Sequence, residues 1–323
     1  MEITLKELIK LVKDIPNDYF EKTYEKLMEI IEEAQANAEK ESKNVVCLEC
    51  DSKAVVRNGK RHGKQAYRCK NCGKTFVETA TSAIQYSHSS ETVWRAVISD
   101  TVDGISIDKT AENLDLTHDK VFNMRHKILF CIEQAILATP VELEGVCEVD
   151  ETYVLESVKG RKIPEDYHRE PRKHGAKASK SGLSEEYVCV QTSVTGETKC
   201  TATAVNRATP SKDEIVEVFG DKIVEDTVIL CDGNANYDVL NEQCTVAHTE
   251  CINKVNGFHS FIKERIRAAR GVSTIYLNRY NALFASIFNN HDYAVNEIYN
   301  LMTARNNSFN TIIDIKSQNL LNI

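Results

Sequence analysis

The sequence has 323 residues, of which 42% are hydrophobic and 27% are charged, and 48 acidic residues against 40 basic residues give a net charge of −8. These values are ordinary for a globular chain, and they exclude collagen-like, coiled-coil and wholly disordered proteins. The length allows two or three domains, whereas only 13 Gly and 5 Pro disfavour a turn-dense all-β fold.

The N-terminal segment, residues 1–45, has helical periodicity with Glu and Lys on its polar side, and Pro16 separates two short helices. Its first residues lack the basic and apolar regions of a signal peptide. No apolar run in the sequence approaches the ~18 residues that span a bilayer. We therefore expect a cytoplasmic protein that does not bind membranes.

Residues 46–80 contain four of the eleven cysteines in a C-x2-C…C-x2-C arrangement, Cys47, Cys50, Cys69 and Cys72. Two residues between cysteines allow a tight turn to direct both thiolates at one metal, and two such turns complete a tetrahedral site. This spacing predicts a zinc ribbon with one structural Zn²⁺. The other seven cysteines lie mostly in apolar runs, so we expect buried free thiols there.

Residues 88–138 have a helical pattern throughout, with two internal breaks. Ser106 can cap a short helix that ends near Asn113, and after a turn Thr117 can cap the next helix. This outline predicts a helix-turn-helix-like domain whose second helix enters a DNA groove. The DNA-binding candidates on that helix are Lys120, Asn123 and Arg125, followed by His126 and Lys127.

From residue 144 the pattern changes to short β-branched runs, which predict a catalytic domain over 144–285 and a weakly helical C-terminal tail over 286–323. We expect strands at 145–154, 186–194, 198–205, 227–232 and 245–248 and helices at 211–219 and 254–269. Three strands followed by alternating helices and strands are the order of a ribonuclease-H-like mixed sheet. The predicted fold class is therefore α+β and multidomain.

Two of these predicted strands carry an aspartate in an apolar context, where a carboxylate is costly unless it is paired or binds a cation. Asp150 lies within the first strand, and Asp232 ends the fourth. In a ribonuclease-H-like sheet these strands are neighbours, so both carboxylates would converge on one point. Hard oxygen ligands suit Mg²⁺ or Mn²⁺, and two such ions ~3.5–4 Å apart can catalyse phosphodiester transfer.

The last predicted helix offers further site residues. Asn256 and Lys263 are seven residues apart and therefore share one helix face, where Asn256 can ligate the metal and Lys263 can bind a phosphate. We expect Glu148 and Glu151 to point to the opposite face of the sheet and to be structural. His259, three residues after Asn256, is expected on the helix surface, from which it could also reach the metal, and His248, just before the helix, could approach the metals.

The cysteine pattern, the Glu148–Tyr153 strand, the Cys231-Asp232-Gly233 strand end and the Asn253–Lys263 helix together resemble the ISXO-type insertion-sequence transposases, which are related to the eukaryotic Merlin transposons. The resemblance covers roughly residues 20–285. It implies a zinc-ribbon and helical DNA-binding region ahead of a DDE-superfamily domain that cleaves element ends and transfers strands. By position, Asp150 and Asp232 match the acidic metal ligands of the family.

The same resemblance shows where the chain departs from most members. Asn256 stands where many have Glu, and His259 stands where Trp is frequent, whereas Lys263 matches the Lys of the Asn-bearing branch. A neutral third ligand leaves less negative charge to hold a second metal, so substrate phosphate is expected to complete the site.

Basic residues are concentrated in three segments, 47–80, 157–183 and 252–279, each with a net charge of +5. The second is an insert after the first catalytic strand that contains Arg172 and Lys173, and the third contains Arg265 and Arg267 beyond Lys263. Such segments bind DNA phosphates with a steep salt dependence. We expect double-stranded DNA as the partner, both the terminal inverted repeats of an element and its target. Holding two ends together implies a homodimer or larger assembly.

Bound to DNA, the protein would be associated with the nucleoid, or nuclear in a eukaryotic host. Two other functions fit the same residues. A sequence-specific DNA-binding regulator with an inactive transposase-derived domain would bind DNA without metal-dependent strand transfer. A related nuclease would produce cut DNA without joining 3′ ends.

Overall fold

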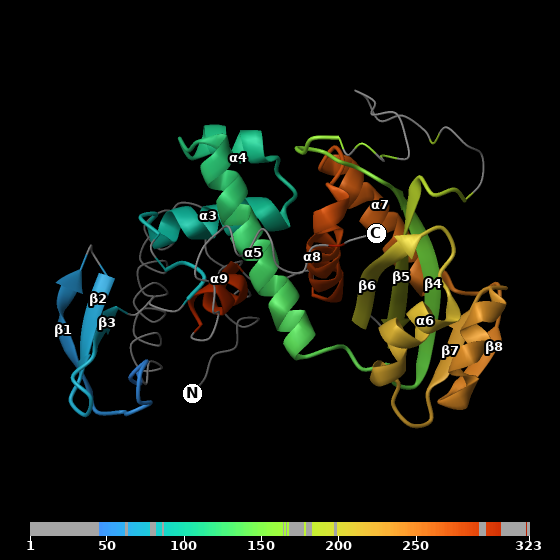
Figure 1. Cartoon of the computed structure of the whole chain (residues 1–323), viewed down its shortest axis with the longest axis horizontal. Helices are drawn as coiled ribbons and strands as arrows, with labels where there is room; N and C mark the ends of the chain where they lie inside the picture. Colours follow the sequence, from blue (N-terminus) through green and yellow to red (C-terminus); the bar gives the residue numbers. More distant parts are fainter. Residues whose placement is uncertain are drawn as a thin grey trace, which may run out of the picture. The chain divides into compact units, whose positions relative to one another are not determined.

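The computed structural model describes residues 45–61, 64–77, 82–85, 87–163, 165, 167, 178, 183–196, 199–290, 295–304 and 321 (Figure 1). The chain divides into two compact units, Met1–Glu78 and Thr79–Ile323. The predicted N-terminal helices, most of the basic insert and much of the C-terminal tail lie outside the described residues.

The first unit contains a three-stranded antiparallel sheet in the order β1-β2-β3. Its strands are β1 (Val55–Arg61), β2 (Lys64–Cys69) and β3 (Thr75–Val77). A small core forms where the rings of Tyr67 and Phe76 stack with their centroids 5.9 Å apart.

Three helices open the second unit, and each begins at a hydroxyl side chain that accepts a backbone N–H. They are α3 (Glu91–Val102), α4 (Ile107–Asn113) and α5 (His118–Ala138). Ser106 and Thr117 are the caps of α4 and α5, as predicted. Asp115, with a φ of 51°, lies in the turn between them.

A five-stranded mixed sheet follows in the order β6-β5-β4-β7-β8. Its strands are β4 (Val146–Leu155), β5 (Tyr187–Thr195), β6 (Lys199–Arg207), β7 (Val228–Cys231) and β8 (Thr245–His248). The first three are antiparallel, whereas β7 and β8 run parallel to β4. The first and fourth strands are therefore neighbours, as expected for a ribonuclease-H-like sheet.

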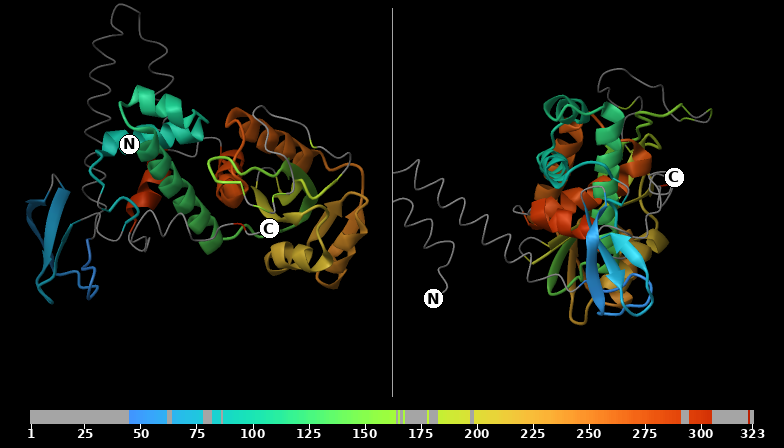
Figure 2. Two further views of the ribbon diagram at one scale, coloured as in Figure 1. Left: turned by 45° about the horizontal axis from the view of Figure 1, so that its top comes forward. Right: turned by 90° about the vertical axis from the view of Figure 1, so that its left-hand side faces the viewer.

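Helices cover both faces of this sheet, and Figure 2 shows the yellow helix α6 and the orange helix α7 on opposite sides. The alternation along β4 explains the two layers: Cys147 and Val149 pack with α6 (Lys212–Phe219) and the 3₁₀ helix η3 (Ala235–Glu242). The residues between them therefore face α7 (Asn253–Ala268).

The second unit has one large core, to which the predicted helix-turn-helix region, the predicted catalytic domain and the tail all contribute. Trp94, Ile128, Phe258 and Leu283 are buried together in it. The remaining elements are η2 (Gly220–Lys222), η4 (Thr274–Tyr276), α8 (Leu277–Asn289) and α9 (Val295–Thr303). None of the helices in the described ranges is long and apolar enough to cross a lipid bilayer.

Candidate functional site: a carboxylate cluster and a four-cysteine cluster

Three carboxylates lie close together where the pairing of β4 with β7 ends. Asp150, Glu151 and Asp232 each offer an oxygen within 4.8 Å of the others. Glu148 pairs with Leu230 in the parallel β4–β7 ladder. Asp150 and Asp232 each lie two residues further along the chain, so they lie beside each other. The expected convergence of the two aspartates is thus present.

Glu151 belongs to this cluster, which corrects the expectation that it points away. Strand β7 ends at Cys231, so beyond that residue β4 has no neighbour on this side. The Glu151 carboxylate reaches across the free edge and accepts a 2.6 Å hydrogen bond from Nδ2 of Asn234, in the loop that carries Asp232. The position of Glu151 thus depends on β4 being longer than β7, which the sequence does not show locally.

Glu148 also differs from expectation, because it lies two residues before Asp150 and shares its face of the sheet. Its Oε2 accepts a 3.0 Å hydrogen bond from the backbone N–H of Val255, in the first turn of α7. Its role is structural, as expected, but on the α7 side.

The three carboxylates repel one another, and Asp150 and Glu151 are partly buried whereas Asp232 is exposed. Burial raises the pKa of Asp150, and the nearby charge of Asp232 raises it further. Burial likewise raises the pKa of Glu151 to about 7. Among the described residues, no Lys or Arg lies within ion-pair distance of these three carboxylates. Oxygen ligands without a salt-bridge partner fit a hard divalent cation such as Mg²⁺ or Mn²⁺.

His259 is a site residue that was expected on the helix surface, yet it is only 5% exposed. Its Nδ1 lies 3.7 Å from Oδ2 of Asp150, and its Nε2 lies 2.6 Å from Oγ1 of Thr192. Burial, together with the charge of Lys263, lowers the pKa of His259 to about 4, so the ring is neutral. The i, i+3, i+4, i+7 spacing of Val255, Phe258, His259 and Ile262 was a signal that it lies on the buried stripe.

Asn256 and Lys263 are both exposed on α7, one on each side of His259 along the helix. The charge of Lys263 acts on both Asp150 and His259. Helical spacing places the side chains of Asn256, His259 and Lys263 within one third of a turn of one another. The face of α7 that carries them therefore meets the carboxylate cluster.

His248 holds the backbone of Asp232 and not its carboxylate. Its Nδ1 lies 2.6 Å from the Asp232 carbonyl oxygen, and its Nε2 lies 2.8 Å from Oδ1 of Asp238. These two acceptors, the carbonyl first, raise the pKa of His248. The ring thus fixes the loop after β7.

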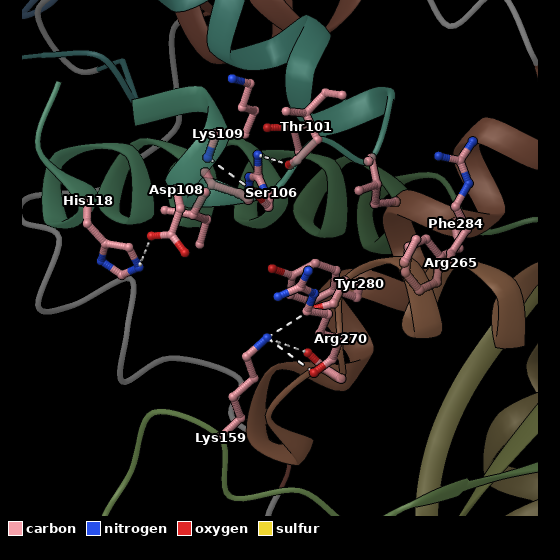
Figure 3. A pocket seen from close by; sticks show the side chains of 18 of the residues that line it. Thr101, Ser106, Asp108, Lys109, His118, Lys159, Arg265, Arg270, Tyr280 and Phe284 are labelled. Carbon is pink, nitrogen blue, oxygen red and sulfur yellow. Dashed lines mark hydrogen bonds and ion pairs between the residues drawn. The ribbon is translucent and has the colours of Figure 1, made fainter. Parts of the chain in front are cut away.

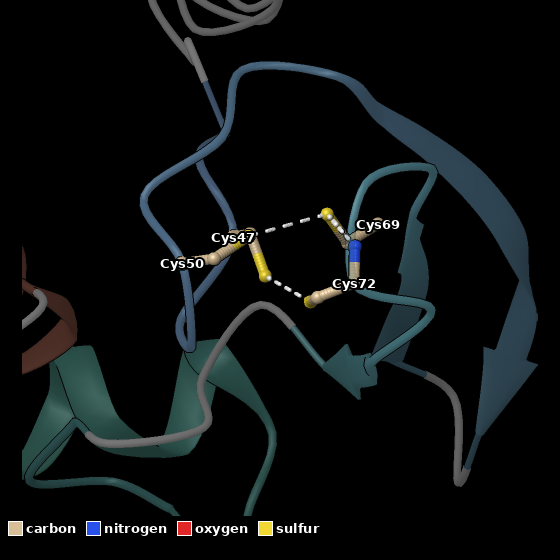
Figure 4. Close-up of side chains that lie close together, drawn as sticks. All are labelled: Cys47, Cys50, Cys69 and Cys72. Atoms are coloured by element: carbon tan, nitrogen blue, oxygen red, sulfur yellow. Dashed lines mark hydrogen bonds between the residues drawn. The ribbon is translucent and has the colours of Figure 1, made fainter.

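The four cysteines of the first unit form a second cluster (Figure 4). Sγ of Cys47 lies 3.5 Å from Sγ of Cys72, and Sγ of Cys50 lies 3.7 Å from Sγ of Cys69. Ligands ~2.3 Å from a tetrahedral Zn²⁺ are ~3.8 Å apart, so these thiols fit that ion. Donation from the Cys72 amide is the main cause that lowers the pKa of Cys69 to about 6, which favours a thiolate.

Of the seven other cysteines, Cys131, Cys147, Cys189, Cys200 and Cys231 are buried free thiols, as predicted. Cys244 is half-buried and Cys251 is exposed.

Comparison with known proteins gives one curated relative. Over 118 residues the chain is 28% identical to a protein described as an uncharacterized protein in transposable element ISH50, from Halobacterium salinarum (strain ATCC 700922 / JCM 11081 / NRC-1). The match covers 36% of this chain and 39% of the relative, about two fifths of its length. No family model matches the sequence.

Solved structures with some similarity include two of Mos1. The crystal structure of a pre-cleavage Mos1 transpososome has a TM-score of 0.27 and 9% identity, covering 63% of this chain and 75% of that chain. The crystal structure of the Mos1 Strand Transfer Complex has a TM-score of 0.28 and 9% identity, covering 71% of this chain and 78% of that chain. Because these scores are low, the fold assignment rests on the strand order and register described above.

The predicted DNA-binding residues of α5 differ in how far they are exposed to solvent. Lys120 is exposed, whereas Asn123 is half-buried. Arg125 is 7% exposed, and its guanidinium donates a 2.8 Å hydrogen bond to the Ile105 carbonyl, so it holds the turn before α4. The neighbouring candidates His126 and Lys127 are also engaged, since His126 is buried and Nζ of Lys127 donates to the Ala83 carbonyl.

A pocket of about 580 Å³ lies between the α3–α4 connection, the end of α7 and α8 (Figure 3). Arg265 lines it and donates to the Val102 carbonyl over 3.1 Å. Nζ of Lys159 donates to the carbonyls of Ala269 and Gly271 over 2.8 and 3.0 Å, which caps the C-terminal end of α7. The side chains of Arg265 and Lys159 therefore bind backbone carbonyls of the protein itself.

Arg267 is exposed, and no hydrogen bond or ion pair of its side chain is found in the part of the chain that the structure describes. Arg172 and Lys173 lie outside the described residues.

Proposed function

We propose that the chain is a DNA transposase of an insertion sequence, which cleaves phosphodiester bonds at element ends and joins them to target DNA with divalent metal ions. The convergence of Asp150 and Asp232 on one partly buried carboxylate cluster carries this proposal. The similarity to a protein of the transposable element ISH50 supports it. On the residue pattern of its helix and cysteines, we assign the chain to the ISXO type.

The carboxylates of Asp150, Asp232 and Glu151 hold the ions, with the side-chain oxygen of Asn256 as a further ligand. When bound, two such ions activate an attacking water or 3′-hydroxyl and neutralise charge on the leaving oxygen. Lys263, exposed on the α7 face that meets the cluster, binds a DNA phosphate as a point charge.

Two polar residues keep the cluster in its arrangement. Asn234 donates to Glu151, and its own backbone N–H donates to Oδ1 of Asp232 over 3.0 Å. His248 holds the Asp232 carbonyl. Such outer contacts orient the groups that bind metal or substrate.

DNA binding is assigned to several surfaces. We propose that the cysteine cluster holds one structural Zn²⁺ in a zinc ribbon, and that α4 and α5 act as a helix-turn-helix that presents Lys120. Exposed Arg267 and the basic insert contact phosphates. Pairing of two element ends requires a dimer or larger assembly.

The test is strand transfer by the full chain with Mn²⁺ or Mg²⁺, using labelled DNA from the terminal repeats that flank the coding region and a target plasmid. We expect joined products with the native chain and with the control Asp213→Ala, which changes an exposed aspartate on α6. Asp150→Ala and Asp232→Ala are expected to abolish joining. Normal joining by either variant overturns the proposal.

The same experiment separates the two alternative functions. Cut DNA without joined 3′ ends identifies a nuclease. End binding with neither cutting nor joining identifies a regulator, the alternative that the neutral Asn256 favours.

A further inference from the structure

The tautomer of His259 is fixed by its neighbour Thr192. Oγ1 of Thr192 donates a 2.8 Å hydrogen bond to the backbone carbonyl of Asp150, and the same oxygen lies 2.6 Å from Nε2 of His259. A hydroxyl has one hydrogen, so toward the ring Oγ1 accepts, and Nε2 carries the proton. In the neutral ring Nδ1 therefore has a free lone pair.

That lone pair belongs to the ring atom nearest Asp150. Nδ1 and Oδ2 are 3.7 Å apart, and both side chains are largely buried, at 7% and 14% exposure. The separation is too long for a hydrogen bond, even to a protonated carboxyl. Two electron-rich atoms in a poorly solvated place thus face each other without a proton between them.

A metal ion accounts for this arrangement. Two ligand atoms that each lie ~2.1 Å from one ion can be separated by up to ~4.2 Å, so a gap of 3.7 Å is within reach. Helix α7 contains no Asp or Glu before Glu264. His259 is therefore the strongest metal-binding group on the helix face that meets Asp150.

We propose that Nδ1 of His259 is a ligand of the site metal alongside Asp150, and that the site prefers Mn²⁺ to Mg²⁺. This inference rests on the proposed function of the carboxylate cluster as a metal site. Mg²⁺ takes oxygen ligands, whereas an imidazole nitrogen shifts a site toward transition-metal ions. Thr192 acts as a positioning residue, because its hydroxyl keeps the proton on Nε2 and leaves Nδ1 for the metal.

The first experiment loads the full chain with Mn²⁺ alone and measures electron spin echo envelope modulation. We expect modulation from a directly bound ¹⁴N nucleus in the native chain. His259→Gln is expected to lose the ¹⁴N signal and at least about tenfold in Mn²⁺ affinity, a loss of the size seen when metal-site contacts are removed. Mg²⁺ affinity, measured by competition, is expected to change less. His118→Gln, at an exposed histidine in the first turn of α5, is the matched control and is expected to keep the signal.

The second experiment leaves the ring in place. Thr192→Val removes the hydroxyl with little change of shape, and we expect about tenfold weaker Mn²⁺ binding, whereas Thr192→Ser is expected to restore it. Circular dichroism checks that each variant is folded. Mn²⁺ that binds without ¹⁴N coupling overturns this inference and leaves the proposed function standing. A native chain that binds no Mn²⁺ overturns both.

Discussion

A carboxylate of the central strand caps the helix that carries half of the proposed site: Oε2 of Glu148 accepts a 3.0 Å hydrogen bond from the N–H of Val255. Ile252 precedes α7 and offers no capping side chain of its own. A negative charge at a helix N-terminus is also favoured by the helix dipole. Glu148 therefore fixes α7, with Lys263, against the strand that bears Asp150.

Removal of this cap is expected to destabilise the protein. Glu148→Ala leaves a helix N–H without its acceptor, and we expect the free energy of unfolding in urea at pH 7 to fall by about 1–3 kcal/mol. The control is Glu144→Ala, which removes an exposed ion pair to Lys199 and should lower the free energy of unfolding much less. Equal losses in the two variants contradict the capping role.

Glu151→Gln is expected to stabilise the metal-free protein while it weakens metal binding. At pH 8 the carboxylate is charged in a desolvated cluster, so its neutralisation relieves repulsion from Asp150 and Asp232. Thermal melts in EDTA should shift upward, and the further shift on addition of Mn²⁺ should shrink. Glu217→Gln, at an exposed position of α6, is the control and should change neither. An unchanged Mn²⁺ shift argues against Glu151 as a ligand.

The sheet and the two aspartates were predictable because strand alternation is a local consequence of the sequence pattern, and because the order of strands and helices indicated that the first and fourth strands are neighbours. Apolar Cys147 and Val149 alternate with acidic residues, and this period-two pattern indicates the two faces of β4. Cysteine spacing similarly predicted the cluster in the first unit, since a C-x2-C turn needs no distant partner.

The remaining features depend on contacts that the sequence does not encode locally. Glu151 joins the cluster only because β7 is shorter than β4. Arg125 was predicted to bind DNA, yet the α3–α4 connection supplies the carbonyl of Ile105 to its guanidinium. The three predicted segments share one core because α5 packs against α8 and α9, which lie far along the chain.

Stability is expected to fall between pH 5 and pH 8 because of Glu133, which is buried on α5 with its Oε2 3.4 Å from Nε of Arg279. Burial raises the pKa of Glu133 to about 7, although Arg279 opposes the shift. The fold favours the protonated form, so this contribution to stability is complete below pH ~4.5 and is lost as the pH rises through about 7.

Glu133→Gln should remove the part of the pH dependence that comes from Glu133. We expect the decrease in unfolding free energy from pH 5 to pH 8 to be smaller than in the native chain, by up to about 3 kcal/mol. Exposed Glu112, whose pKa is lowered by its hydrogen bond to Lys109, is a suitable control because its contribution does not change above pH 5. A native chain whose stability is flat over this range contradicts the prediction.

Cys69→Ser is expected to release zinc and to impair binding of element ends. Serine replaces one of the four thiolates that fit a tetrahedral ion, and a closed Zn²⁺ site contributes directly to folding. Metal content by mass spectrometry is the measurement. Cys251→Ser, at an exposed cysteine outside the cluster, should retain one zinc per chain. Full zinc content in the Cys69 variant is the outcome against a ribbon.

Arg267→Gln and Arg265→Gln separate a DNA contact from a structural cation on the same helix. Arg267 is exposed, so its loss should weaken DNA binding for all sequences and reduce the salt slope by about one, without a change in stability. Arg265 donates to the Val102 carbonyl and lies over the Phe261 ring at 4.9 Å, so its loss should lower the melting temperature. Filter binding across a salt series and thermal melts measure the two effects. If Arg267→Gln leaves the salt slope unchanged, this end of α7 does not contact DNA phosphates.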